Sequence, residues 1–155
     1  MKIAVIGIGQ SLRGDDAAGL AAVHQWQEKF PETATRPEVR VEASELPGLA
    51  LIEMLNDVDV AILIDAVQSG AAPGTIHRIG EKDLSAFSSD AKSAHGWGVA
   101  ETLTLSRQLN QNLPPIRIIG IEAAQMMMGA SMSEAVEAAI PHACEAIEQE
   151  IKSLL

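Results

Sequence analysis

Residues 2–16 read KIAVIGIGQSLRGDD, an apolar run that passes into a glycine-bounded loop and ends on two aspartates. The near-continuous apolar run over residues 2–8 predicts a strand that is buried on both faces, as strands of parallel sheets are. From residue 15 to about Phe30, apolar side chains recur at helical spacing, and Pro31 ends the pattern. This strand–loop–helix opening is typical of an α/β protein.

The rest of the chain continues the alternation of strands and helices. We expect further strands at Val39–Ala43, Val58–Ile64, Gly74–Ile79 and Ile116–Ile121, and further helices at Leu49–Leu55, Val99–Leu109 and Ser133–Leu155. Gly74–Ile79 fits an edge strand or hairpin arm, and residues 81–95 fit an irregular connection. Alternation of this kind indicates a parallel or mostly parallel sheet with helices on both faces. The predicted fold is a single three-layer α/β domain over residues 1–155, with a mostly parallel twisted sheet of about five strands sandwiched between helices.

The composition fits a protein that needs neither a disulfide nor a membrane. Apolar residues make up 47% of the 155, which is enough for a sizeable core, and the single cysteine cannot form an intramolecular disulfide. The apolar run at the N-terminus is too short for a signal sequence. The other apolar stretches are strand-sized, well below the roughly 20 residues that span a bilayer. We therefore expect a cytoplasmic protein without a membrane partner.

The charge balance argues against nucleic acid as a partner. The formal net charge is −10, and aromatic residues are only 3% of the chain. Binding to phosphate backbones depends on clustered Lys and Arg, and single-stranded bases stack on aromatic side chains. Both features are scarce in this sequence.

Three residues are candidates for a metal-binding active site. In open α/β sheets, ligands bind beyond the carboxyl ends of the strands, where the strand order reverses. Asp16 follows the first predicted strand, Asp65 follows the third, and His95 lies in a glycine-flanked loop. Two carboxylates and one imidazole suit a divalent metal, with positions left open for water or substrate. From spacing alone the ordinary roles stay open: Asp15 or Asp16 as a helix cap, Asp65 as a turn residue and His95 as a loop histidine.

The glycine-rich opening resembles the signature of the hydrogenase maturation protease family. Residues 7–19 read GIGQSLRGDDAAG. The family signature is G-x-G-N-x-L, two variable residues, D-[DE], two more residues and G, directly after the first strand. Asp65-Ala66 at the end of an apolar strand resembles the second family motif, and Ser93-Ala94-His95 resembles the third. The three motifs occur in family order at family-like separations, so the resemblance covers essentially the whole chain.

The resemblance implies a fold, an activity and a substrate. The family fold is a five-stranded sheet between helices. Its members are peptidases that remove the C-terminal extension of a nickel-loaded [NiFe]-hydrogenase large-subunit precursor. By motif position, the catalytic and metal-contacting residues here are Asp16, Asp65 and His95. They are expected to grip the nickel that the precursor carries, so that metal occupancy reports that the substrate is ready. Whether the free enzyme holds a metal is left open.

The first loop also supplies candidate substrate-binding residues, namely Gly7, Gly9, Gln10 and Gly14. Glycines lack a Cβ and would let the backbone of the precursor approach closely. Gln10 replaces the asparagine that is usual in the family, which lengthens the amide side chain by one methylene. Ala17 stands where glycine is common, and the first predicted ligand is Asp rather than Glu.

Two other functions are compatible with parts of the sequence. The same three ligands would serve a non-catalytic chaperone that checks the nickel-loaded precursor. A nucleotide-binding Rossmann-like domain would use Gly7 and Gly9, but the next glycine is Gly14, which gives G-x-G-x-x-x-x-G instead of G-x-G-x-x-G. Asp15 and Asp16 at the helix start would also repel a pyrophosphate.

Three further features have simpler predicted roles. Cys144 and His142 are two residues apart on the predicted C-terminal helix and point to different faces, which argues against a Cys–His pair. Residues 126–128 are three methionines, which could fill the core or make a flexible apolar contact with the substrate tail. The acidic residues of the C-terminal helix are expected on a solvated face: Glu134, Glu137, Glu145, Glu148 and Glu150.

Overall fold

The computed structural model describes residues 1–45, 49–84, 99–109 and 112–155. Its centre is a five-stranded sheet in the order β2-β1-β3-β5-β4. The strands β1, β2, β3 and β5 are parallel, and β4 pairs antiparallel with β5 at the edge. Their bounds are Ile3–Ile8 (β1), Val39–Ser44 (β2), Val60–Val67 (β3), Ile76–Gly80 (β4) and Ile116–Glu122 (β5). The predicted mostly parallel sheet with an edge strand is confirmed.

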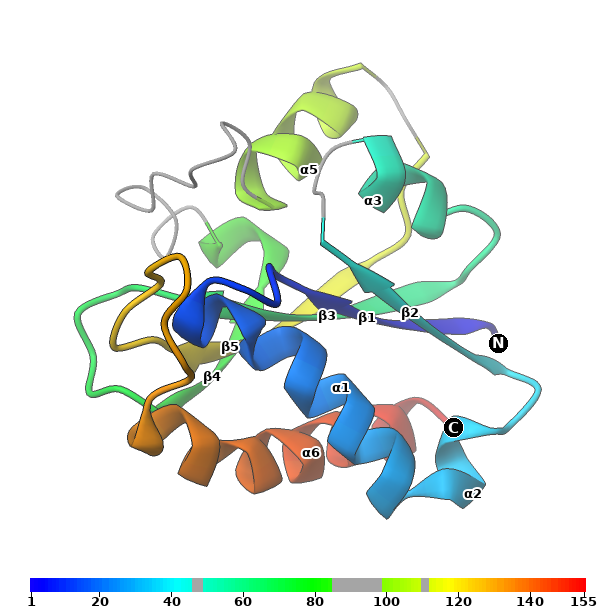
Figure 1. The fold of residues 1–155 in the computed structure, drawn as a ribbon. Helices are drawn as coiled ribbons and strands as arrows, with labels where there is room; N and C mark the ends of the chain where they lie inside the picture. Colours follow the sequence, from blue (N-terminus) through cyan, green and yellow to red (C-terminus); the bar gives the residue numbers. More distant parts are fainter. Residues whose placement is uncertain (46–48, 85–98, 110–111) are drawn as a thin grey trace.

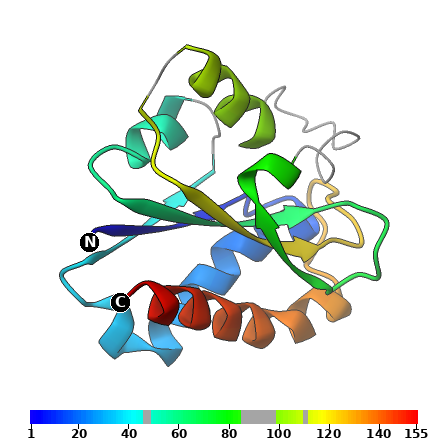
Figure 2. The ribbon, with the colours of Figure 1, turned by 180° about the vertical axis from the view of Figure 1, so that it is seen from behind.

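Helices cover both faces of the sheet, as Figures 1 and 2 show from opposite sides. One face is covered by α1 (Ala18–Lys29) and α6 (Glu134–Leu154), and the other by α3 (Leu49–Met54) and α5 (Val99–Gln108). The short helix α2 (Pro31–Ala34) follows α1, and two 3-10 turns are η1 (Gly14–Ala17) and η2 (Glu81–Asp83). The three-layer architecture expected from the sequence is therefore confirmed.

The alternation of side chains along the strands divides the core into two layers. In β3, Ile62 and Ile64 pack toward α1 and α6, whereas Ala61 and Leu63 pack on the opposite side. All six residues of β1 are buried, as predicted for a strand covered on both faces. Each large apolar side chain that is fully buried stabilises the fold by about 1.5–3 kcal/mol.

One acidic residue of α6 belongs to the core and not to the solvated face. Glu148 is only 4% exposed. Its carboxylate accepts a hydrogen bond from Nε1 of Trp26 at 2.9 Å and another from Oγ1 of Thr33 at 2.7 Å. The prediction of a fully solvated acidic face is wrong at this position, because a buried tryptophan needs an acceptor for its N–H.

The largest change from a predicted boundary is at the end of β3. The strand expected to stop before Asp65 continues through it to Val67, because the pairing with β5 runs on from Asp65–Gly120 to Val67–Glu122. Pro31 ends α1 as predicted, but it also begins α2, where its fixed φ suits a first helical turn.

The chain order places a switch point between β1 and β3. The connection from β1 to β2 runs through α1 on one face, and the connection from β2 to β3 runs through α3 on the other. The strand order therefore reverses between β1 and β3, which is where ligands bind in such sheets. Among the residues with described positions, no helix is long and apolar enough to cross a membrane.

Candidate active site

Asp16 and Asp65 lie at the same edge of the sheet, at the switch point. Asp16 is in η1, directly after the loop that follows β1, and Asp65 is near the carboxyl end of the neighbouring parallel strand β3. Asp65 alternates with Ile64 and Ala66, which pack toward α1 and α6, so its side chain points to the face that carries α3 and α5. The structure thus brings together the two carboxylates predicted from the sequence.

A glycine in the first turn of α1 allows the two segments to approach so closely. A Cβ on Gly19 would lie 2.2 Å from the carbonyl oxygen of Ile64 and 2.5 Å from that of Ile8. The start of α1 therefore rests directly on the backbone of β1 and β3, one residue before Asp65. Any larger side chain at this position would push the helix, and Asp16 with it, away from the strand end.

The first loop holds the Asp16 side chain through its own backbone. The N–H of Gln10 donates to Oδ2 of Asp16 at 3.1 Å. The Gln10 side chain reaches the other way, and its Nε2 donates to the carbonyl oxygen of Glu45 at 2.6 Å. The N–H of Ser11 donates to Oε1 of Glu45 at 2.9 Å. The longer Gln10 amide is therefore occupied by the fold and fastens the loop to the end of β2.

The environment of Asp65 disfavours its negative charge. Burial, and after it the charge of Asp16, raise the pKa of Asp65 to about 8, although a backbone hydrogen bond from Ala66 acts to lower it. Two carboxyl groups held together in this way repel each other when both are ionised. A divalent cation bound by both carboxylates would relieve that repulsion, so the chemistry of this pair suits a divalent metal.

His95, the third predicted ligand, lies outside the described residues. Within the described ranges, no group of three or more His, Cys, Asp or Glu side chains could hold a metal ion. The two described residues that flank the segment containing His95 are Leu84 and Val99, and both pack on the face of the sheet to which Asp65 points. The role of His95 stays a prediction.

The three glycines predicted to bind substrate meet atoms of the chain itself. A Cβ on Gly7 would lie 2.9 Å from the carbonyl oxygen of Gly19, and one on Gly9 would lie 1.9 Å from that of Asp16. At Gly14, where φ is +55°, it would lie 2.3 Å from Oε1 of Gln125. Glycine at these positions thus lets the loop fold tightly on α1 and on the loop after β5. A contact of these residues or of Gln10 with substrate stays a prediction.

Asp15 has a role that sequence reasoning missed. Its carboxylate is fully buried and accepts hydrogen bonds from the loop after β5 and from Ser133 at the start of α6, rather than capping the helix that follows it. Burial raises the pKa of Asp15, but the hydrogen bonds from Ser133, Ala124 and Gln125 together lower it below its ordinary value. No local signal reveals these partners, because they are 109 to 118 residues away in sequence.

A second carboxylate that sequence reasoning missed lies at the end of β5. Glu122 is 2% exposed and accepts hydrogen bonds from the N–H of Ser69 at 2.8 Å and from Oγ of Ser69 at 2.5 Å. Nε2 of His77 lies 3.0 Å from Oε1 of Glu122. This cluster fastens the connection between β3 and β4 to β5. The strand-end rule that singled out Asp65 would also have singled out Glu122, which directly follows the predicted strand 116–121.

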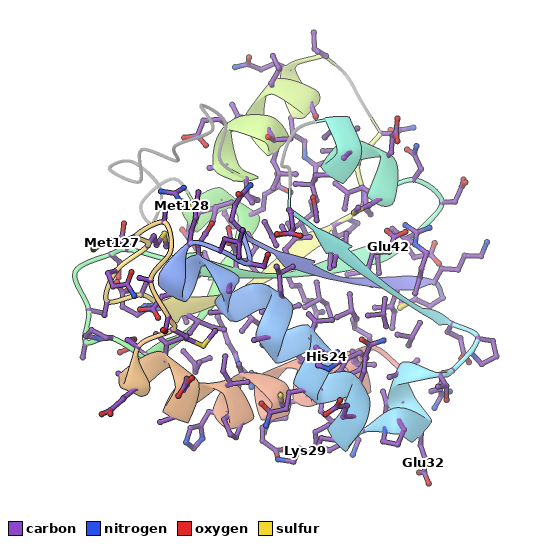
Figure 3. All side chains as sticks on the ribbon, in the orientation of Figure 1. His24, Lys29, Glu32, Glu42, Met127 and Met128 are labelled. Carbon is purple, nitrogen blue, oxygen red and sulfur yellow. The ribbon has the colours of Figure 1, made fainter. Side chains whose placement is uncertain are left out.

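Exposed apolar side chains lie on the rim beside the two aspartates. Leu12 is 71% exposed, Met127 is 65% exposed and Met128 is 66% exposed. The N–H of Gly129 donates to the carbonyl oxygen of Leu12 at 2.7 Å, which joins their two loops. Figure 3 shows Met127 and Met128 on the loop after β5, at the end of the sheet where α1 begins. Core filling is therefore wrong for these two methionines.

The cysteine takes no part in the site. Cys144 is buried, and its thiol donates to the carbonyl oxygen of Ala22 at 3.4 Å. Burial raises the pKa of its thiol, which is the opposite of what a nucleophilic cysteine needs. His142 is exposed, so the two side chains lie on different sides of α6, as predicted.

Comparison with known proteins decides the family. A family model described as hydrogenase maturation protease matches residues 28–150. The chain belongs to the hydrogenase maturation protease family. The family predicted from the three motifs is therefore confirmed, and with it the class of enzyme, a peptidase of hydrogenase maturation.

Relatives of this protease family match over most of the chain. The hydrogenase expression/formation protein HupD of Thiocapsa roseopersicina is 28% identical over 81% of this chain, which spans 56% of that relative's length. HupD of Rhodobacter capsulatus is 27% identical over 98% of this chain and 72% of its own length. The hydrogenase maturating endopeptidase HybD from E. coli has the same fold, with a TM-score of 0.82 at 23% identity, covering 99% of this chain and 93% of that one.

The backbone of the first loop also argues against a nucleotide-binding fold for this chain. The N–H groups of Gly14, Asp15 and Asp16 donate to the carbonyl oxygens of Ala130, Gln125 and Arg13. A pyrophosphate site needs such N–H groups to point at the ligand. The Rossmann-like alternative is therefore disfavoured by the glycine spacing and by these N–H groups, which already donate to carbonyl oxygens of the chain.

Proposed function

We propose that this protein is an endopeptidase that removes the C-terminal extension of a nickel-loaded [NiFe]-hydrogenase large-subunit precursor. The single observation that carries the proposal is the placement of Asp16 and Asp65 together at the switch point of a hydrogenase maturation protease fold. The names of the similar proteins, which include a hydrogenase maturating endopeptidase, support the same substrate class.

The proposed mechanism uses nickel as part of the substrate. Asp16, Asp65 and the predicted ligand His95 would contact the nickel already installed in the precursor, which positions the scissile peptide at the rim. Water adds to the scissile carbonyl carbon, the C–N bond breaks, and the leaving amine takes a proton. The attacking water would be activated either by the nickel of the substrate or by a carboxylate that leaves the nickel during turnover. Nickel-free precursor would not be held in register and would stay uncut.

The rim beside the aspartates suits a protein substrate. Leu12, Met127 and Met128 are largely exposed on two joined loops next to Asp16. Methionine side chains are flexible and adapt to irregular apolar surfaces. A contact between this rim and the precursor tail is part of the proposal. A cytoplasmic location also belongs to it, supported by a chain whose one cysteine is buried and has no partner for an intramolecular disulfide.

The experiment that tests the proposal is incubation with nickel-loaded and nickel-free large-subunit precursors from the same source organism, followed by intact mass measurement. Loss of one discrete C-terminal peptide from the nickel-loaded form alone is the expected result. Binding of the nickel-loaded form without any change in mass would instead favour the chaperone alternative. Equal cleavage of both forms would contradict the role of nickel.

A further inference from the structure

Asp15 is a fully buried carboxylate that the proposed mechanism does not use. Its Oδ2 accepts hydrogen bonds from the N–H of Ala124 at 2.8 Å, the N–H of Gln125 at 3.3 Å and Oγ of Ser133 at 2.9 Å. Its Oδ1 accepts the N–H of Ser133 at 2.7 Å. Ser133 is the N-cap residue of α6, so the carboxylate also lies at the positive end of a 21-residue helix.

The backbone around Asp15 joins the same two loops. The N–H of Asp15 donates to the carbonyl oxygen of Gln125 at 3.0 Å, and the N–H of Gly14 donates to that of Ala130 at 3.2 Å. In the opposite direction, the N–H of Gly129 donates to the carbonyl oxygen of Leu12 at 2.7 Å. The first loop and the loop between β5 and α6 therefore form one hydrogen-bonded body, with the Asp15 carboxylate at its centre.

Asp16 directly follows Asp15 in the chain, so its position depends on how these two loops are joined. Its N–H donates to Arg13 and its Oδ2 accepts from Gln10, and both partners belong to the first loop. Since η1 is only four residues long, the direction of the Asp16 side chain depends on where the loop is held. The carboxylate of the preceding residue, Asp15, ties that loop to the loop between β5 and α6 through four hydrogen bonds.

We propose that Asp15 is a positioning residue, which aims the Asp16 carboxylate by locking the first loop to the loop between β5 and α6. The buried Asp15 side chain thus holds the first loop in place, and the Asp16 side chain would contact the substrate. This proposal rests on the proposed function, because Asp16 is taken to contact the nickel of the precursor.

The chemistry of the site requires a carboxylate and not an amide. An ionised carboxylate has only acceptors, and four donors converge on Asp15. Asparagine in either orientation would turn its NH2 group toward N–H donors on one side. Asp15→Asn is therefore expected to break the lock while leaving the volume of the side chain almost unchanged.

The test is a double-mutant cycle on binding to nickel-loaded precursor, measured by surface-immobilised titration at a temperature where every variant is folded. Asp15→Asn is expected to weaken binding by about 10- to 100-fold, the range typical of residues that orient metal ligands. In the Asp16→Asn background the same substitution is expected to weaken binding by less than about 2-fold, because its effect passes through Asp16. Asp59 is exposed and directly precedes β3, at the amino ends of the parallel strands. Asp59→Asn is therefore the matched control and should change nothing.

The cycle distinguishes positioning from general stabilisation. An equal loss of affinity in both backgrounds would overturn the proposal, as would unchanged binding by a folded Asp15→Asn variant. If Asp15→Asn does not fold, Ser133→Ala replaces it in the cycle, since it removes only the hydroxyl donor to Asp15. Ser133→Ala is expected to weaken binding by a few-fold, and only when Asp16 is present. Cleavage of nickel-loaded precursor by the unmodified protein tests the proposed function separately.

Discussion

Asp16 and Asp65 lie close enough together that the charge of Asp16 adds to burial in raising the pKa of Asp65. Asp16 lies in η1, after the loop that follows β1, and Asp65 lies near the carboxyl end of the neighbouring parallel strand β3, so both are at the switch point of the sheet. Asp65 therefore stays largely protonated at neutral pH, with a pKa of about 8. A pair of carboxyl groups in this state costs stability when both ionise, and this cost can be measured.

Replacing Asp65 by asparagine should stabilise the protein at alkaline pH. A group whose pKa is raised by folding favours the folded state below its ordinary pKa of 3.8, and this contribution is lost as the pH rises through about 8. Asparagine does not titrate, so the unmodified protein alone loses this contribution. Relative to the unmodified protein, the free energy of unfolding of Asp65→Asn should therefore rise by about 3–5 kcal/mol between pH 4 and pH 9. Urea unfolding at the two pH values measures this difference, and an equal difference at both would contradict the assigned environment.

Replacing Asp15 by asparagine should destabilise the protein, with the opposite dependence on pH. Hydrogen bonds lower the pKa of Asp15 below 3.8, so its contribution is present above that pH and is lost as the pH falls through the lowered value. At pH 7 Asp15→Asn should lower the free energy of unfolding by about 2–4 kcal/mol, because buried donors lose a charged acceptor. The deficit should shrink at acid pH in urea titrations. A deficit that is constant from pH 7 to pH 3 would show that the carboxylate charge is unimportant.

Replacing Gly19 by alanine should displace α1. The new Cβ would lie 2.2 Å from the carbonyl oxygen of Ile64, so the helix must move although alanine favours helices. We expect a loss of more than about 2 kcal/mol of stability, in the range of overpacked sites, together with loss of cleavage. Gly80→Ala is the matched control, since the nearest atom to its Cβ would be 3.8 Å away. Thermal unfolding of both variants decides, and equal midpoints would refute the close packing.

Replacing Met127 and Met128 by serine should weaken substrate binding without affecting the fold. Both side chains are about two-thirds exposed, so their loss leaves no cavity. If the rim contacts the precursor tail, KM should rise by about 10-fold, equivalent to about 1.4 kcal/mol, with kcat little changed. Leu155→Ser, which is also exposed but lies at the end of α6, serves as the control. An unchanged KM in the double variant would remove the rim from the substrate interface.

The sequence predicts well what depends on local periodicity and chain order. The apolar run of β1, the helical spacing of α1 and the alternation of elements determine the mostly parallel sheet, and parallel neighbours place Asp16 and Asp65 at one edge. The predicted end of β3 is wrong by three residues, because a strand ends where its partner ends and not where its sequence turns polar. Asp65 is thus held inside a strand, opposite Gly120, and is less free than a turn residue.

The sequence does not reveal contacts between residues distant in the chain. Asp15 looks like a helix cap, yet its partners are Ala124, Gln125 and Ser133. Glu148 looks like one member of a solvated acidic face, yet it accepts the Trp26 N–H 122 residues away. In each case the residue type shows that a charge is present, and only the folded chain shows which donors surround it.

The most direct test of the central claim is the intact mass of nickel-loaded large-subunit precursor after incubation with the unmodified protein, with Asp16→Asn, with Asp65→Asn and with the exposed control Asp59→Asn. We predict that the unmodified protein and Asp59→Asn remove one discrete C-terminal peptide, and that Asp16→Asn and Asp65→Asn slow this cleavage by at least about 100-fold. Nickel-free precursor should stay intact in every case. Cleavage by folded Asp16→Asn and Asp65→Asn at the rate of the unmodified protein would contradict the assignment of the active site to the carboxyl ends of β1 and β3.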